Sequence, residues 1–257
     1  MITNLELDHF FQDIFLQQKN IKDIVPNGLQ FEGKLNIAKV SFAVSATHDV
    51  ITKAIENGSD ALFTHHGFFW PNDQRSFRGA IKSKFQKLFD SQLNIFAYHL
   101  PLDLHPKFGN NYPILSNLKC KNINSFCEYG FMGELEQELT IDELEVFLSK
   151  TYSRKATLVV PPHKKHIKNI AILSGQGTSY LPQIVAINSN SHNLKIDTFI
   201  TGEASEWSYS MSKENNIVYV ALGHNNSEEI GVKLIQKLLL TTFRDLECHF
   251  IAEDNPF

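Results

Sequence analysis

The sequence has few cysteines and no excess of basic charge, and these deficits exclude several classes of protein. Only three of its 257 residues are cysteine, and they follow neither a zinc-ligand spacing nor a CxxC spacing. We therefore expect free thiols in a reducing, cytoplasmic environment. The formal net charge is −4, so no positive field points to a nucleic-acid partner or to an anionic membrane surface.

Long apolar runs are also missing. No run approaches the roughly 20 residues that a membrane-spanning helix needs. The first fifteen residues carry acidic side chains and no basic segment, so we expect no signal peptide. The composition, 42% hydrophobic and 20% charged, is that of a globular chain and not of a disordered or disulfide-stabilised one. What the sequence does have in excess is histidine, with 11 copies.

Short apolar segments alternate with segments of helical periodicity. The spacing predicts strands over residues 40–44, 61–63 and 94–98, and helices over residues 47–57 and 80–89. Strands that alternate with helices indicate an α/β domain with a largely parallel sheet. Further elements are predicted at residues 7–15 (helix), 140–148 (helix with a capping box of Thr140 and Glu143), 158–160 (strand) and in the second half of the chain.

From about residue 169 the pattern of the first half recurs. Residues 170–175 are similar to residues 42–45, residues 198–203 to 61–66, and residues 216–224 to 94–99. We interpret this as a duplication that gives two related α/β halves, residues 1–127 and 128–257. A metal cleft is expected between them, because ligands usually bind at domain boundaries and at the carboxyl ends of parallel strands.

Three polar clusters directly follow short predicted strands: His65-His66, the segment from His99 to Asp103, and the segment from His224 to Glu228. Two histidines and one carboxylate would suffice for a single catalytic zinc with an open position. At least three histidines and two carboxylates suit two ions instead, bridged about 3.5–4 Å apart. Adjacent histidines on an extended strand point to opposite faces, so we place this pair in a bend after the strand.

Each cluster also has a structural interpretation. A His-His pair is commonly a surface feature, and Asp103 could be a turn residue. Asn226 and Glu229 form a possible capping box, which would make Glu228 only a first-turn acid that interacts with the helix dipole.

The chain resembles the Nif-three-like dinuclear-metal family, often labelled GTP cyclohydrolase I type 2-like. The resemblance covers nearly the whole chain, in the family's order, through Asn27-Gly28-Leu29-Gln30, Thr64-His65-His66-Gly67 with Trp70, His99-Leu100-Pro101-Leu102-Asp103, Thr201-Gly202-Glu203 and Gly223-His224-xxx-Glu228. The length matches the family's compact bacterial form, without an inserted domain. Asn225 stands where many relatives have a second histidine, which could alter the pocket.

The resemblance implies two α/β halves, a toroidal homohexamer, and a two-metal site in a cleft facing the ring interior. The ions would be zinc, iron or manganese. The ligands carried over by matching motif are His65, His66, Asp103, His224 and Glu228. Glu203 and His99 follow strands, and we expect them either to transfer protons or to orient the metal-binding histidines.

The expected activity is hydrolysis by a metal-activated water, because two bridged ions lower the pKa of the water that they share. A nucleotide-like small molecule, opened as GTP is opened by a cyclohydrolase, is implied by the family label alone. The alternatives are a metal-binding regulatory or interaction protein without turnover, and a metal-dependent phosphodiesterase. Phe68, Phe69 and Trp70 beside the cluster are expected at a subunit or domain boundary, or else in the core.

Overall fold

The computed structural model describes residues 1–15, 21–73, 76–190 and 195–257. It divides into two compact units, which are Met1–Phe108 with Gly231–Asp254 (unit 1) and Gly109–Ile230 with Asn255–Phe257 (unit 2). Each unit contains a main sheet with helices on both faces, which confirms the α/β class. The predicted halves meet between residues 127 and 128, a point inside unit 2, and their origin by duplication stays a prediction.

Unit 1 is built on a five-stranded sheet in the order β13-β4-β5-β6-β2, in which only the edge strand β2 is antiparallel to its neighbour. A separate pair, β1 and β3, is antiparallel. The elements of unit 1 are β1 (Ile2–Thr3), α1 (Asn4–Phe15), β2 (Gly28–Phe31), β3 (Asn36–Ile37), β4 (Lys39–Ser45), α2 (His48–Glu56), β5 (Ala61–His66), α3 (Gly79–Ser91), β6 (Asn94–Ala97), α4 (Leu100–Asp103), β13 (Glu247–Phe250) and most of α9 (His224–Thr242).

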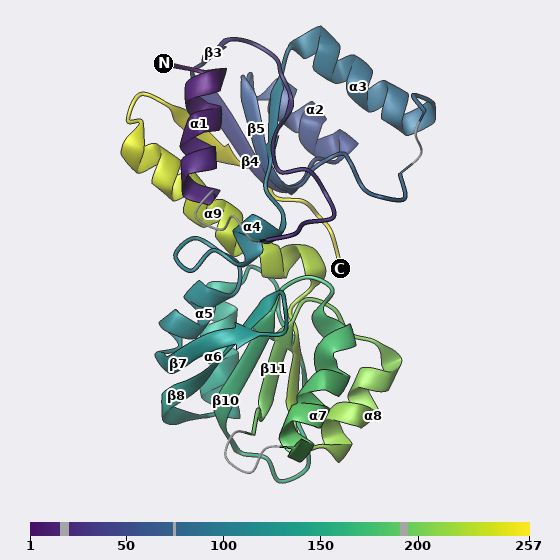
Figure 1. Ribbon diagram of the computed structural model, residues 1–257, viewed down its shortest axis with the longest axis vertical. Helices are drawn as coiled ribbons and strands as arrows, with labels where there is room; N and C mark the ends of the chain where they lie inside the picture. Colours follow the sequence, from purple (N-terminus) through teal and green to yellow (C-terminus); the bar gives the residue numbers. More distant parts are fainter. Residues whose placement is uncertain (16–20, 74–75, 191–194) are drawn as a thin grey trace. The chain divides into compact units, whose positions relative to one another are not determined.

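Helices cover both faces of the unit 1 sheet, as Figure 1 shows. Helices α1 and α9 pack on one face, where Phe11 and Ile235 meet Phe42 and Phe63 of the strands. Helices α2 and α3 pack on the other face against the alternate strand residues, such as Leu62. The strands are therefore buried on both faces, which is why they read as continuous apolar runs in the sequence.

Unit 2 is built on a six-stranded sheet in the order β7-β8-β10-β11-β12-β9. Its central strands β10, β11 and β12 are parallel, and β8 and β9 flank them in the antiparallel sense. The elements of unit 2 are α5 (Tyr112–Asn117), β7 (Cys120–Phe126), β8 (Gly130–Thr140), α6 (Ile141–Thr151), β9 (Thr157–Val159), β10 (His166–Leu173), a 3-10 turn (Gly177–Tyr180), α7 (Leu181–Asn190), β11 (Thr198–Thr201), α8 (Glu206–Glu214), β12 (Val218–Ala221) and the start of α9.

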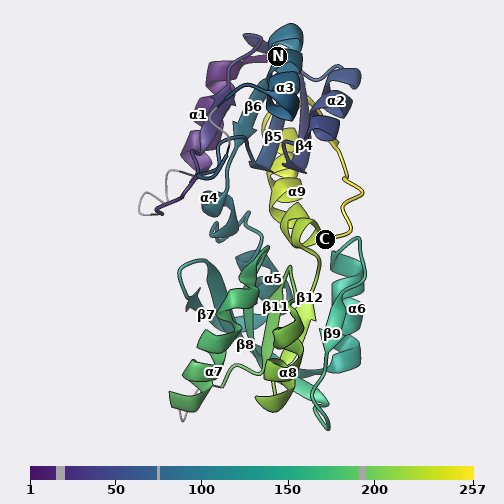
Figure 2. The same ribbon diagram turned by 90° about the vertical axis from the view of Figure 1, so that its right-hand side faces the viewer.

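The unit 2 sheet is also covered on both faces. Figure 2 shows α6 on the opposite side of this sheet from α7. Ile170 and Ile172 of β10 pack toward α5 and α6, whereas Ala171 and Leu173 pack toward α7. This alternation is the two-residue period of a strand buried on both faces.

The predicted helix starts of α2 and α6 are confirmed. Thr47 is the N-cap of α2, and its hydroxyl accepts a hydrogen bond from the Val50 N–H. Thr140 and Glu143 form the predicted capping box of α6. Within the described residues, no helix is both long and apolar enough to cross a membrane.

The strands matched across the sequence hold equivalent places in the two sheets. In unit 1, β4, β5 and β6 are adjacent and parallel, and in unit 2, β10, β11 and β12 are adjacent and parallel. The predicted polar clusters end β5 or follow β6 and β12, and Glu203 follows β11. Each unit therefore presents its polar clusters at the carboxyl ends of its parallel strands, where α/β proteins bind ligands.

Candidate metal centre

His65 and His66 are the last two residues of β5, and not residues of a bend as predicted. The strand continues through them because β4 still pairs with it there, with Ser45 opposite His66, although the pairing with β6 ends at Thr64. His65 is completely buried, whereas His66 is half-buried. The two rings nevertheless lie near each other, with centroids 4.5 Å apart.

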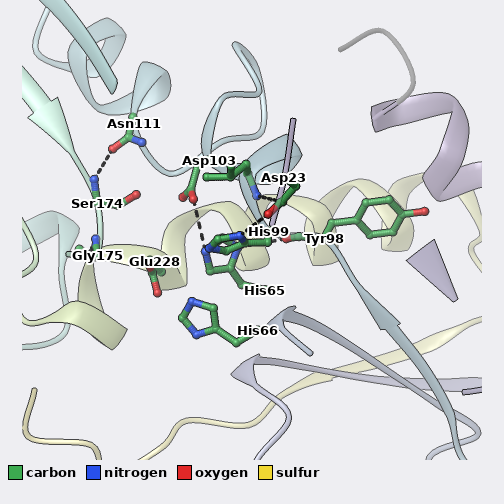
Figure 3. Close-up of polar contacts among 12 residues, drawn as sticks. Asp23, His65, His66, Tyr98, His99, Asp103, Asn111, Ser174, Gly175 and Glu228 are labelled. Carbon is green, nitrogen blue, oxygen red and sulfur yellow. Dashed lines mark hydrogen bonds and ion pairs between the residues drawn. The ribbon is translucent and has the colours of Figure 1, made fainter. Parts of the chain in front are cut away.

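The buried His65 is held in one tautomer. Its Nδ1 lies 3.0 Å from the carbonyl oxygen of Tyr98, and a carbonyl only accepts, so Nδ1 carries the proton. In the neutral ring this leaves the lone pair on Nε2, which lies 3.5 Å from Oδ2 of Asp103 (Figure 3). A histidine whose Nδ1 donates to a backbone carbonyl is the usual arrangement of a metal ligand that binds through Nε2.

His99 joins this pair. One ring nitrogen from each of His65, His66 and His99 can be chosen so that all three lie within 4.8 Å of one another. Three imidazole donors at this separation could hold a metal ion. Figure 3 shows the three side chains converging. The structure thus places His99, predicted as a proton-transfer or orienting residue, among the candidate ligands themselves.

Asp23 orients His99 and was not predicted. Its Oδ1 lies 3.0 Å from Nδ1 of His99, and its Oδ2 accepts a hydrogen bond from the backbone N–H of Leu100. Burial alone would raise the pKa of Asp23, but the hydrogen bonds from His99 and Asn27 outweigh it and lower the pKa to about 2. Asp23 is therefore a carboxylate at neutral pH, and it favours a proton on Nδ1 of His99.

Two side chains of the motif Asn27-Gly28-Leu29-Gln30 form hydrogen bonds with the backbone beside the histidine cluster. Oδ1 of Asn27 accepts a hydrogen bond from the backbone N–H of His99, at 2.7 Å. Oε1 of Gln30 accepts one from Phe68, at 2.8 Å. A Cβ on Gly67 would collide with the Gln30 amide, so a larger residue after the two histidines would displace that amide. These side chains fix the backbone on both sides of the cluster, and only the family resemblance signalled them in the sequence.

Asp103 lies on the short helix α4, which follows β6, and it is 7% exposed. Its carboxylate lies 3.5 Å from Nε2 of His65. Asp103 is therefore not the simple turn residue that the alternative interpretation of the sequence predicted. Nδ1 of His66 lies 3.0 Å from the Ser45 hydroxyl, which is either donor or acceptor there. Unit 1 therefore brings together His65, His66, His99 and Asp103.

The site residues of unit 2 lie at the start of α9. The helix begins at His224, so Asn226 lies in its first turn and the predicted capping box of Asn226 and Glu229 is wrong. Instead, the Asn226 amide donates to the carbonyl of Leu222. His224 and Glu228 are one helical turn apart, and Nε2 of His224 lies 3.2 Å from Oε1 of Glu228.

Glu203 contacts the other side of the His224 ring. Its Oε1 lies 2.6 Å from Nδ1 of His224. Burial lowers the pKa of His224, but the Glu228 and Glu203 carboxylates outweigh burial and raise the pKa to about 9. Glu203 therefore contacts His224 at the nitrogen where an orienting partner acts, and its two predicted roles stay predictions.

Gly175 was not predicted as a site residue, although it follows β10 in the repeated pattern. Its backbone has φ of +62°, and a Cβ there would collide with Oε1 of Glu228 and lie 3.1 Å from Nε2 of His224. The N–H groups of Gly202 and Glu203 both donate to the Gly175 carbonyl. A side chain at this position would displace the His224–Glu228 pair, so glycine is required by close approach.

The donors fit a divalent transition metal. They are imidazole nitrogens and carboxylate oxygens, the set that suits zinc, iron and manganese. Each histidine also has a partner at Nδ1, namely Tyr98, Ser45, Asp23 or Glu203 for His65, His66, His99 and His224 respectively. Partners at Nδ1 are what orient metal-binding histidines in known sites.

One alternative predicted that the aromatic residues after the histidine pair, Phe68, Phe69 and Trp70, are buried in the hydrophobic core. None of the three is fully buried. Phe68 packs against the core cluster under α2 and α3, but Phe69 is 47% exposed and Trp70 is half-buried. Their placement at a subunit or domain boundary stays a prediction.

Fold and donors together define the class: an α/β protein with histidine and carboxylate clusters at the carboxyl ends of its parallel strands. The chain belongs to the DUF34/NIF3 family. The family model described as Duf34/NIF3 (NGG1p interacting factor 3) matches residues 6–256, which is nearly the whole chain.

Curated relatives and solved structures agree with this assignment. The chain is 34% identical over 247 residues to a protein of Pasteurella multocida named GTP cyclohydrolase 1 type 2 homolog, covering 94% of each chain. A Buchnera aphidicola protein of the same name is 32% identical over 241 residues, again covering 94% of each. Among solved structures, protein ybgI of unknown function has a TM-score of 0.87 at 28% identity, and TTHA1606 from Thermus thermophilus has 0.86 at 26%, each covering 100% of both chains.

Proposed function

We propose that the chain is a dinuclear metal-dependent hydrolase of a nucleotide-like small molecule. The observation that carries the proposal is the histidine cluster of unit 1, in which the rings of His65 and His99 each direct Nδ1 to a fixed acceptor. An imidazole held in this way has its ligand atom oriented before any metal binds.

The proposed ligands are His65, His66 and Asp103 of unit 1 with His224 and Glu228 of unit 2. Neither set alone has enough ligands for two ions. The two sets together have three imidazoles and two carboxylates, which suit a two-metal centre. Zinc, iron and manganese all suit this donor set. The matching family motifs support the pooling of the two sets in one site.

Two divalent ions held by these residues would supply a nucleophile near neutral pH, because a bound metal lowers the pKa of water. The chain's own residues then have separate tasks. Glu203 orients His224 through Nδ1, and Asp23 orients His99 in the same way. His99 is the residue best placed to exchange a proton with a substrate bound beside the cluster, because Asp23 fixes the orientation of its ring through Nδ1.

The substrate class rests on the relatives. Several curated relatives carry the name GTP cyclohydrolase 1 type 2 homolog, and purine-ring opening with loss of formate consists of two successive hydrolyses. The direct test incubates the zinc-, iron- or manganese-loaded protein with GTP, other nucleotides, phosphodiesters and amides. We expect formate release from a nucleotide, its loss on chelation and its return with metal.

Two alternatives are separated by the same screen. The family description, an interacting factor, favours a metal-binding regulatory protein without turnover. Two-metal centres also occur in phosphodiesterases, although the net charge of −4 does not favour a nucleic-acid channel. Turnover of a phosphodiester but not of a nucleotide would favour the phosphodiesterase, and no turnover between pH 6 and 9 would favour the binding protein.

A toroidal homohexamer is proposed from the family resemblance. Light scattering at micromolar concentration tests it, and a monomer there would exclude the ring.

A further inference from the structure

A pocket in unit 1 lies beside the histidine cluster and contains none of the proposed metal ligands. It has a volume of about 620 Å³, which is within the range of small-molecule sites. Five aromatic side chains contribute to its wall: Phe68, Phe69, Trp70, Phe77 and Phe85. Such a concentration of rings in one concave surface needs an explanation beyond the packing of the unit.

The rings pack with each other but leave much of their surface open. Phe85 lies at the centre of the group, with its ring centroid 5.0 Å from that of Phe77 at 87° and 5.3 Å from that of Phe68. Yet Phe69 is 47% exposed and Phe77 is 66% exposed. Exposed aromatic rings that line a hollow offer π-surfaces on which a planar ring can stack.

Trp70 connects this pocket with the histidine cluster. Its ring centroid lies 5.5 Å from that of His66 and 5.3 Å from that of His99. A tight turn fixes it, since the Trp70 N–H donates to Oδ2 of Asp73 and the Asp73 N–H donates to the Trp70 carbonyl. A molecule in the pocket would therefore touch a residue that also contacts two of the candidate ligand histidines.

One basic side chain lines the pocket wall. Nζ of Lys84 lies 5.4 Å from the centroid of the Phe68 ring and donates to the carbonyl of Ala46 at 3.0 Å. Burial lowers the pKa of Lys84, and the Asp73 carboxylate of the same wall, which accepts a hydrogen bond from Trp70, raises it. An ammonium with one neutral acceptor can still pair with an anion, and such charge-assisted contacts are strong.

We propose that this pocket binds the planar unsaturated ring of the substrate, with a negatively charged substituent near Lys84. The inference rests on the proposed function for the view that the bound molecule is a substrate. The binding itself does not depend on turnover, so it can be measured separately.

Tryptophan fluorescence gives a direct reading. The chain has two tryptophans, Trp70 and Trp207, and Trp207 is 38% exposed on α8 of unit 2. The Trp207→Phe protein leaves Trp70 as the reporter. In the metal-loaded protein we expect guanosine monophosphate to quench Trp70, guanosine to quench it with weaker affinity, and ribose 5-phosphate to have no effect.

Two exposed phenylalanines of similar exposure provide a matched pair. Phe77 lines the pocket, whereas Phe89 is 61% exposed on α3 and packs on Phe31 away from it. Loss of a stacking ring typically costs about fivefold or more in affinity, so Phe77→Ala should raise the Kd for guanosine monophosphate by that factor. Phe89→Ala should leave it unchanged. Phe69→Ala repeats the test. Lys84→Met should weaken the binding of guanosine monophosphate to the affinity of guanosine, because only the nucleotide carries the negative charge that Lys84 would bind.

Several results would overturn the inference. Quenching by ribose 5-phosphate equal to that by the nucleotide would mean that only the anion binds, and no quenching by either would exclude the site. A change of oligomeric state in Phe77→Ala, with no change in quenching, would assign the rings to a contact between copies. Nucleotide binding without turnover would contradict the hydrolase and leave the pocket assignment intact. Turnover with an unchanged KM in both phenylalanine variants would contradict the pocket alone.

Discussion

The two units present histidines and carboxylates in different ways. In unit 1, His65 and His66 end a strand, and the partner of the buried His65 at Nδ1 is a backbone carbonyl. In unit 2, His224 begins a helix and lies between two carboxylates, those of Glu203 and Glu228. Parallel strands position the imidazoles in both units, but the partner at Nδ1 is a neutral carbonyl for His65 and a carboxylate for His224.

These different surroundings of His65 and His224 predict different proton changes when a metal binds. His65 donates from Nδ1 to a neutral acceptor, and its Nε2 lies 3.5 Å from Oδ2 of Asp103. The carboxylates around His224 raise its pKa to about 9, although burial opposes them, so the ring holds a second proton at neutral pH. A metal that binds Nε2 of His224 must displace this proton. The ring of His65 in unit 1 is therefore already oriented by a neutral partner, whereas His224 in unit 2 would have to lose a proton to bind a metal.

The largest effect is expected from Asp103, the carboxylate that faces His65. Asp103→Asn keeps the size of the side chain but removes its charge. Metal affinity should fall by more than the roughly 10–100-fold that the loss of an outer partner costs, and any turnover should fall with it. Calorimetric metal titration measures the affinity. Asp13→Asn, at an exposed position of α1, is the control, and equal affinity in the two variants would exclude Asp103 as a ligand.

Glu203→Gln tests the orienting role in unit 2. Because Glu203 contacts Nδ1 of His224 at 2.6 Å, we expect metal affinity to weaken by about 10–100-fold, with a mild rate effect at saturating metal. A proton-transfer role would instead leave metal bound and lower the rate by about 10²–10⁴-fold. Comparing the rate at saturating metal with the metal affinity separates the two outcomes.

Gly175→Ala tests the close packing behind the unit 2 pair. The left-handed backbone alone should cost about 1–2 kcal/mol of stability, and the collision with Glu228 should add to this. Gly58→Ala is the matched control, because Gly58 has φ of +70° and a Cβ there would meet no atom of the other described residues within 4 Å. Urea denaturation should therefore show the larger loss for Gly175→Ala. Equal losses would mean that the His224–Glu228 pair adjusts freely.

The smallest effect is structural. Thr47→Ala removes the N-cap of α2 in unit 1 and should cost about 1 kcal/mol in the free energy of unfolding. Metal binding should not change, because α2 carries none of the proposed ligands. A loss of metal in this variant would show that the histidine cluster depends on the general stability of unit 1.

The sequence predicted the elements well where local signals are strong. Thr47 and Thr140 are hydroxyl residues at helix starts, and both were predicted as caps. The end of β5 was placed too early, because two histidines read as a polar break. Pairing with the neighbouring strand β4, which no local pattern encodes, extends the strand through His66.

Residues that contact the candidate ligands but lie far from them in the sequence were harder to predict. Asp23 contacts His99 across 76 positions in the sequence, and nothing near Asp23 distinguishes it from an ordinary loop carboxylate. Gly175 is required by Glu228, which lies in another element of unit 2. Asn226 and Glu229 had the correct spacing for a capping box, but α9 starts before them, at His224.

The most direct test of the account is the number of metal ions bound per chain. After reconstitution with zinc, manganese or iron and removal of free metal, elemental analysis should give about two ions per chain. His66→Ala and Glu228→Ala, one from each unit, should each lower this number while the circular dichroism stays nearly unchanged. A ratio of one or less in the unmodified protein, or an unchanged ratio in both variants, would contradict a dinuclear centre to which both units contribute.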